Sequence, residues 1–140
     1  MNYAEYLSYF RQMIDVHIRW QDVEQVRQPI YDQTMRSFAD EFRRSLDYDA
    51  QYRQTLRAAE ITPQINHETV GDVMLTNQDR LVKAMLSMII DGENQRKGTW
   101  AQALTEGYFF QLVSALCPAT VITEWVRRIN TKCRNFMGYQ

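Results

Sequence analysis

The sequence is poor in the residues that build metal sites, disulfides and nucleotide-binding loops. Its 140 residues include only two cysteines, two histidines, three prolines and five glycines. A closed zinc site would therefore use nearly every cysteine and histidine in the chain. The glycine patterns of phosphate and dinucleotide loops are absent, as is the G-x-S-x-G of serine hydrolases. We expect no metal and no cofactor, and the sequence favours a protein that is not an enzyme.

The charges exclude a strong field of either sign. The formal net charge is −1, and 24% of the residues are charged. Neither nucleic acid nor an anionic membrane surface is favoured as a partner by this balance. Apolar residues make up 45% of the chain, enough for a globular core at this length.

The two cysteines, Cys117 and Cys133, lie in apolar contexts and show no C-x-x-C spacing. We interpret both as buried free thiols. The first residues, MNYAEYLSYF, lack the basic start and apolar run of a secretory signal. A reducing compartment, the cytoplasm, is the expected location.

The longest uncharged stretch is residues 107–123, GYFFQLVSALCPATVIT. Crossing a bilayer takes about 20 mainly apolar residues. Here polar residues interrupt the run and Pro118 divides it into two short helical pieces. The stretch is therefore predicted to be buried core, and no membrane contact is expected.

Apolar residues recur every three or four positions, which predicts an all-α fold. We expect a single domain over residues 1–140, a compact bundle of five to six helices around a buried central helix at roughly 100–116. The boundaries come from prolines, glycines and capping patterns, with a long connection at residues 61–72 and a polar loop at 92–98. The predicted helices span residues 2–28, 29–47, 49–60, 76–91, 99–117 and 118–138.

Three polar residues fall on the apolar face of the first predicted helix: His17, Gln21 and Glu24. One interpretation is a polar pocket in which Glu24 orients His17 as a base or ligand. The other, which we favour, is that the helix bends or leaves the core after Trp20.

The last predicted helix carries Arg127, Arg128, Lys132 and Arg134 away from its apolar face. These residues could form a patch for phosphate or an acidic partner. We favour the simpler interpretation, in which they complement the helix dipole and aid solubility.

By elimination, the favoured function is a non-catalytic helical protein that binds another protein, as an inhibitor, immunity-type protein, adaptor or chaperone. A homodimer is a further option, because apolar helix faces left over in the monomer would need cover. Two alternatives stay open. One is a small-ligand binder or enzyme with a pocket around His17 and Glu24, and the other is a nucleic-acid-associated or assembly subunit that uses the basic last helix.

Overall fold

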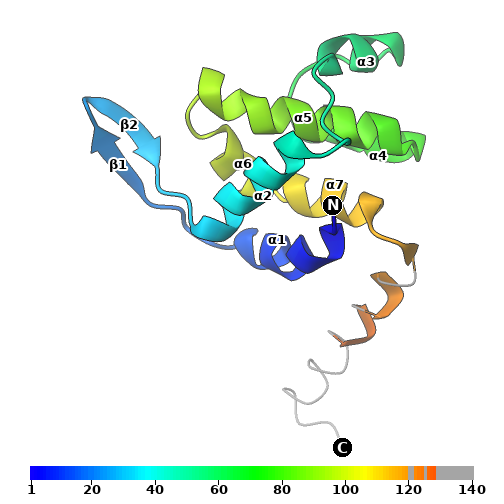
Figure 1. Ribbon diagram of the computed structural model, residues 1–140, viewed down its shortest axis with the longest axis horizontal. Helices are drawn as coiled ribbons and strands as arrows, with labels where there is room; N and C mark the ends of the chain where they lie inside the picture. Colours follow the sequence, from blue (N-terminus) through cyan, green and yellow to red (C-terminus); the bar gives the residue numbers. More distant parts are fainter. Residues whose placement is uncertain (120–121, 125, 129–140) are drawn as a thin grey trace, which may run out of the picture.

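The computed structural model describes residues 1–119, 122–124 and 126–128, and its fold is mainly helical (Figure 1). The prediction of a helical bundle is confirmed. Within the described residues the elements are η1 (Tyr3–Tyr6), α1 (Leu7–Met13), β1 (Trp20–Val23), β2 (Val26–Pro29), α2 (Gln33–Arg44), α3 (Tyr52–Ala58), α4 (His67–Thr76), α5 (Asp79–Gln95), α6 (Thr99–Thr105) and α7 (Tyr108–Leu116).

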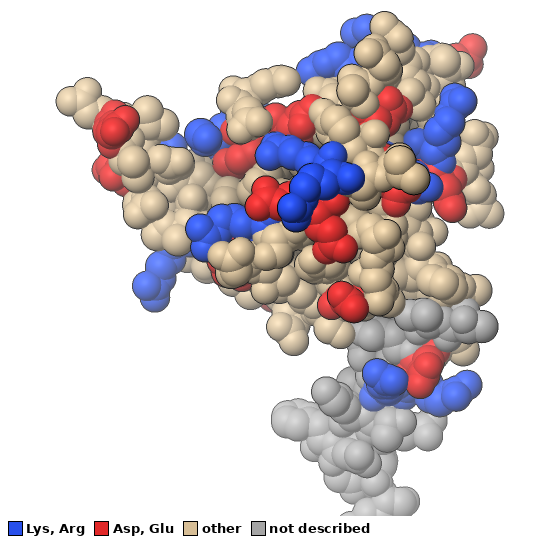
Figure 2. Space-filling view, in the orientation of Figure 1, with Lys and Arg blue, Asp and Glu red and all other residues tan. Residues whose placement is uncertain are grey.

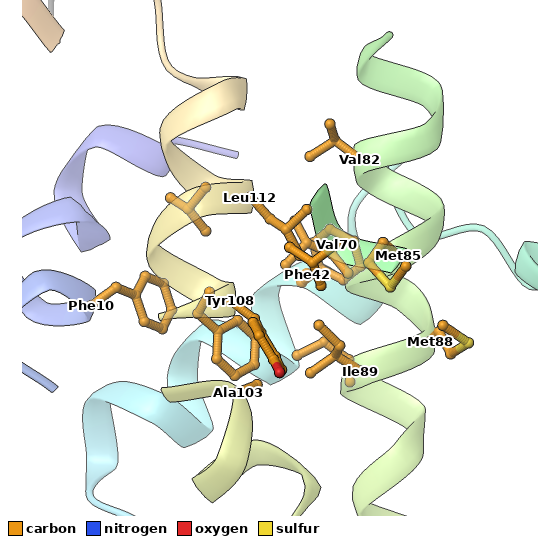
Figure 3. Packing of buried hydrophobic residues seen from close by; sticks show 14 of the residues in the cluster. Phe10, Phe42, Val70, Val82, Met85, Met88, Ile89, Ala103, Tyr108 and Leu112 are labelled. Carbon is orange, nitrogen blue, oxygen red and sulfur yellow. The ribbon is translucent and has the colours of Figure 1, made fainter. Parts of the chain in front are cut away.

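Helix α7 lies at the centre of the core, in contact with α1, α4, α5 and α6. Phe10 of α1 approaches it from one side, and Met85 and Ile89 of α5 lie on the other (Figure 3). Tyr108 and Leu112 of α7 are at most 1% exposed. Burying a side chain of this size contributes about 1.5–3 kcal/mol, so α7 is a main source of stability.

Most large apolar side chains of the uncharged stretch are buried, as the sequence predicted, among them Tyr108, Phe109, Leu112 and Val113, whereas Ala115 is exposed. The stretch is not part of one continuous helix, however, because Gly107 adopts a left-handed conformation between α6 and α7. The predicted central helix is therefore two helices, and the turn lets both present apolar faces to α5. No helix among the described residues is long and apolar enough to cross a membrane.

Three tyrosines of the first two helices bind carboxylates on or beside α2. Their hydroxyls donate hydrogen bonds from Tyr3 to Asp47 (2.5 Å), from Tyr6 to Glu41 (2.6 Å) and from Tyr9 to Asp32 (2.8 Å). The tyrosines follow one another at intervals of three, so they share one face of the helix. Their partners occur in the reverse order, which fixes the N-terminal segment antiparallel to α2.

The largest departure from the predicted helices lies in residues 14–29. The first helix ends at Met13, not Gln28, and a two-stranded antiparallel hairpin follows (Figure 1). Residues 16–26 contain the β-branched Val16, Ile18, Val23 and Val26, which favour strands over helices. Pro29 is therefore the last residue of β2 and does not open a helix.

Other boundaries differ for local reasons. Asp32 caps α2 by accepting a hydrogen bond from the Met35 amide (3.0 Å). Asn66 and Thr69 form a capping box, so helix α4 begins within the predicted long connection and continues past its end. Helix α5 continues past Gly92, which the sequence suggested as its end. A Cβ at Gly92 would lie 2.8 Å from Thr99, so this glycine allows α6 to approach closely.

Candidate functional site

Five exposed apolar residues gather in the hairpin and its immediate flanks. Each is between 39 and 49% exposed, and together we call them the hairpin surface: Val16, Trp20, Val23, Val26 and Ile30. Strand alternation puts Val23, Val26 and Ile30 on one face of the hairpin and Trp20 on the other. The hairpin projects from the helical body, so these side chains lie on an element that a partner could reach (Figures 1 and 2). Clustered exposed apolar residues are typical of contact sites, whereas isolated ones are ordinary.

Contacts at the base of the hairpin fix it to the turn between α5 and α6. The Tyr31 and Trp100 rings are 5.1 Å apart, and Pro29 is buried. The Trp20 ring lies against Gly98, which has a φ of +98°. An isolated two-stranded hairpin is barely stable in water, so these contacts are what hold this one in place.

Glu93 links the hairpin base to helix α6 and is only 6% exposed. Its Oε1 accepts hydrogen bonds from the Tyr31 hydroxyl (2.8 Å) and the Trp100 amide (2.8 Å), and its Oε2 accepts one from the Gly98 amide (3.0 Å). Tyr31 in turn accepts from the Ala101 amide (3.0 Å). The carboxylate thus satisfies amides at the start of α6, which is the task of an N-cap residue.

The same hydrogen bond perturbs Tyr31. Burial, followed by the neighbouring Glu93 carboxylate, raises the pKa of the Tyr31 hydroxyl above its ordinary value. The hydroxyl therefore stays protonated and donates to Glu93 at neutral pH. This arrangement is fully hydrogen-bonded, so we interpret it as a structural support for the hairpin.

A surface depression of about 260 Å³ adjoins the hairpin surface. Its floor and walls mix apolar side chains with the hydrogen-bonded Tyr9–Asp32 pair. The lining comes from the end of α1, the connection to β1 and the residues after β2: Tyr9, Met13, Val16, His17, Ile18, Arg19, Ile30, Tyr31 and Asp32. It extends the hairpin surface toward α1 and would admit an apolar side chain.

The three polar residues singled out in the sequence do not share a helix face. His17 lies exposed in the connection before β1, Gln21 is in β1, and Glu24 is in the hairpin turn. The predicted stripe is wrong because the chain leaves the helix at Met13. Of the three, only His17 lines the depression. A role for these residues in binding stays a prediction.

The proposed basic patch is only partly described. Arg128 lies 3.1 Å from Glu124 in an exposed ion pair one helical turn away, which accounts for part of its charge. Arg127 is exposed beside it. Lys132 and Arg134 lie outside the described residues, as does Cys133. A role for the patch in binding is therefore still a prediction.

A larger hollow, of about 570 Å³, lies beside the N-terminal segment. Two of its charged groups are paired, because Asp47 lies 3.1 Å from the Lys83 amine, and Asp47 also accepts a hydrogen bond from the Tyr3 hydroxyl. Burial alone would raise the pKa of Asp47, but the bonds to Tyr3 and Lys83 outweigh it and lower the pKa. We interpret these bonds as a structural link between η1, the connection that follows α2, and helix α5.

The remaining side chains that could take part in catalysis, those of His67 and Cys117, do not form a common site. His67 opens α4, is exposed, and lies 2.7 Å from Glu106. Cys117 is a buried free thiol, and burial raises its pKa, which disfavours the reactive thiolate. Among the described residues no group of histidine, cysteine and carboxylate side chains is arranged to hold a metal ion.

Comparison with known protein families, curated proteins and solved structures finds no match to this chain.

Proposed function

We propose that this protein acts without catalysis, by binding another protein through the hairpin surface and the adjoining depression. The observation that carries the proposal is the gathering of Val16, Trp20, Val23, Val26 and Ile30 on one projecting element. Water contact with these side chains is unfavourable, and a partner that covered them would gain free energy from their burial.

The form of the element supports the same proposal. Its base is held by Trp20, Tyr31 and Glu93, so a partner would meet a preformed surface and would not have to order it. On one face of the hairpin the Gln21–Gln28 pair lies between the two valines and Ile30, and on the other face the Asp22–Arg27 ion pair (3.7 Å) lies next to Trp20. Apolar side chains interspersed with polar ones are common in protein interfaces.

The class of protein that fits this mode of action is an inhibitor, immunity-type protein, adaptor or chaperone. We place it in the reducing cytoplasm, and the free thiol of Cys117 supports that location.

The test replaces the two valines at the hairpin end with charges, in the double variant Val23→Glu/Val26→Glu. Leu75→Glu is the matched control, because Leu75 is 86% exposed on α4, away from the hairpin. The three proteins are immobilised, incubated with a native extract, and the retained proteins are measured by mass spectrometry. Circular dichroism confirms that each variant is folded.

We expect a protein retained by the wild type and by Leu75→Glu to be lost with the double variant by at least about tenfold. If the double variant retains the same proteins in the same amounts, the hairpin surface is not the binding element and the proposal is wrong.

A further inference from the structure

The two edges of the hairpin differ in what they offer another strand. The Ile30 amide donates to the Arg19 carbonyl (2.8 Å), which fixes the alternation of the ladder. The main-chain N–H and C=O groups of Gln21 and Val23 therefore point toward β2. Those of Trp20 and Asp22 point outward, away from β2.

The outer edge of β2 is closed by comparison. By the same alternation its outward-facing positions are Arg27 and Pro29, and proline has no N–H to donate. Proteins commonly block exposed strand edges with proline. In Figure 1, β2 is the strand nearer to α5 and α6, whereas β1 forms the outer side of the hairpin. The open edge is thus the one that faces away from the body.

We propose that β1 pairs in antiparallel fashion with β1 of a second copy, which gives a four-stranded sheet of order β2-β1-β1-β2. The inference rests on the proposed function insofar as it takes the hairpin as the contact element. The outward groups allow a two-fold axis at Gln21, so that Trp20 of each copy lies opposite Asp22 of the other. About four main-chain hydrogen bonds would form. Neighbouring two-fold registers would place Asp22 opposite Asp22, or Trp20 opposite Trp20.

The distribution of charge favours this orientation. The end of the hairpin is acidic, with Asp22 and Glu24, and Figure 2 shows acidic side chains gathered there. The base carries Arg19, together with Lys97 next to the Gly98 that Trp20 contacts. Antiparallel pairing sets the acidic end of each copy beside the basic base of the other, which lowers the electrostatic energy of the pair. Parallel pairing would bring like charges together.

The same register determines which side chains of the two hairpins share a face of the sheet. Side chains of Val23 and Val26 share one face of the hairpin, and Arg19 and Ile30 lie on that same face at the base. With the axis at Gln21, Val23 of one copy lies opposite Arg19 of the other. The apolar groups of one hairpin end then stand in the same row as Ile30 of the second copy. Arg19 of the second copy stands between Val23 and that Ile30, and the Gln21–Gln28 pairs form the central row, so this face of the dimer mixes apolar and polar side chains.

A disulfide tests the register. Both native cysteines are first replaced, as Cys117→Ala and Cys133→Ala, and Gln21→Cys is added. Residue 21 of each copy would face its equivalent in a non-hydrogen-bonded pair, in which Cβ atoms are close enough for a disulfide. We expect a covalent dimer under mild oxidation. Gln28→Cys, on the same face but on β2, is the control and should stay monomeric. Failure of Gln21→Cys to cross-link, or equal cross-linking of Gln28→Cys, overturns the register.

Two proline substitutions test the edge. Asp22→Pro removes the outward N–H of β1, and Arg27→Pro removes the outward N–H of β2. Both leave the hydrogen bonds within the hairpin intact and both break the same Asp22–Arg27 ion pair. Light scattering is measured at concentrations up to about 1 mM, because a short strand edge gives a weak dimer. We expect dimers for the wild type and Arg27→Pro, and at least about a tenfold rise in the dissociation constant for Asp22→Pro.

A wild type that stays monomeric over this range, or an Asp22→Pro variant that still dimerises fully, overturns the proposal. Loss of the dimer in both proline variants also overturns it, because the open edge would then not be the determinant. These results are separable from those of the extract experiment. A monomeric wild type whose partner is lost on Val23→Glu/Val26→Glu refutes the dimer alone, whereas a dimer that retains no other protein refutes the proposed function alone.

Discussion

The ring of Trp20 lies so close to the α-carbon of Gly98 that a Cβ built on Gly98 would be 2.6 Å from Cη2 of Trp20. This contact joins the first residue of β1 to the turn before α6. It requires glycine for a second reason, since Gly98 has a φ of +98°, where a side chain is strained.

Gly98→Ala should therefore loosen the hairpin. We expect a loss of about 1–2 kcal/mol in the free energy of unfolding, because the ring must move and the backbone is strained. Urea denaturation measures the loss, and Trp20 fluorescence should shift toward the red. Gly71→Ala is the control: Gly71 lies in α4 with nothing within 4 Å of the added Cβ. It should raise stability by about 0.5–1 kcal/mol. Equal effects of the two substitutions would contradict this account.

The hairpin turn has backbone strain that other residues at the same two positions would reduce. Glu24 and Gln25 both have positive φ, 52° and 68°, as the central residues of a type I′ turn do. This turn type strongly prefers asparagine and glycine, and other residues there are strained by about 1–2 kcal/mol.

Gln25→Gly should relieve part of this strain and lower the local opening of the hairpin. We expect the amide of Val26 to exchange about tenfold more slowly with solvent, measured by hydrogen exchange in NMR. Amides of α7, which exchange through unfolding of the whole fold, should slow by a similar factor, because relief of strain stabilises the native state against every opened state. Faster exchange at Val26 would show that glycine's flexibility outweighs the relief of strain.

The same turn explains why the sequence analysis missed the hairpin. V-E-Q-V lacks the Asn-Gly or Asp-Gly that signals a tight turn. His17, Gln21 and Glu24 happen to fit a helical period of 3.6, so the run read as a longer helix. The long-range contacts of Trp20 with Gly98 and of Tyr31 with Glu93 stabilise the hairpin over a helix, and no local sequence pattern shows these contacts. The β-branched residues between Val16 and Val26, which favour strands, were the available signal.

The centre of the fold was easier to predict from the sequence. Helix α7 is apolar on most sides, and such a helix is stable only when it is buried. Tyr108 and Leu112 are buried as expected. The split at Gly107 was not predicted, since a single glycine in a helical pattern is often tolerated. Its positive φ depends on how α6 and α7 both meet α5, which is a tertiary effect.

Glu93→Gln should destabilise the protein although it changes shape very little. Both carboxylate oxygens accept hydrogen bonds, so an amide nitrogen in place of Oε2 would face the Gly98 N–H. Two donors in contact leave one buried N–H unsatisfied. We expect a loss of about 1–3 kcal/mol in the free energy of unfolding, measured by urea denaturation.

Glu106→Gln is the matched control for this substitution. Glu106 has a half-exposed side chain paired with His67 at the surface, so its loss should change stability by less than about 0.5 kcal/mol. A Glu93 variant as stable as the wild type would mean that Glu93 is not the cap of α6.

Stability should fall at alkaline pH through the tyrosine–carboxylate bonds. Burial and the bond to Glu41 raise the pKa of Tyr6 to about 12, and the bond to Asp91 together with burial raises that of Tyr48 to about 12, from 10.0. A raised folded-state pKa means that the unfolded chain loses its protons first as pH rises. The stabilisation is complete below pH 10.0 and is lost as pH approaches 12.

The double variant Tyr6→Phe/Tyr48→Phe tests this dependence. It should be less stable than the wild type at pH 8 by about 1 kcal/mol for each lost hydrogen bond. Between about pH 10 and 12 its stability should fall less steeply, because two of the groups that release protons on unfolding are gone. Urea denaturation at a series of pH values measures both effects. Parallel curves of unfolding free energy against pH for the wild type and the variant would contradict this prediction. They would mean that the two tyrosine hydroxyls titrate alike in the folded and unfolded states, so that the carboxylates do not raise the pKa of the tyrosines.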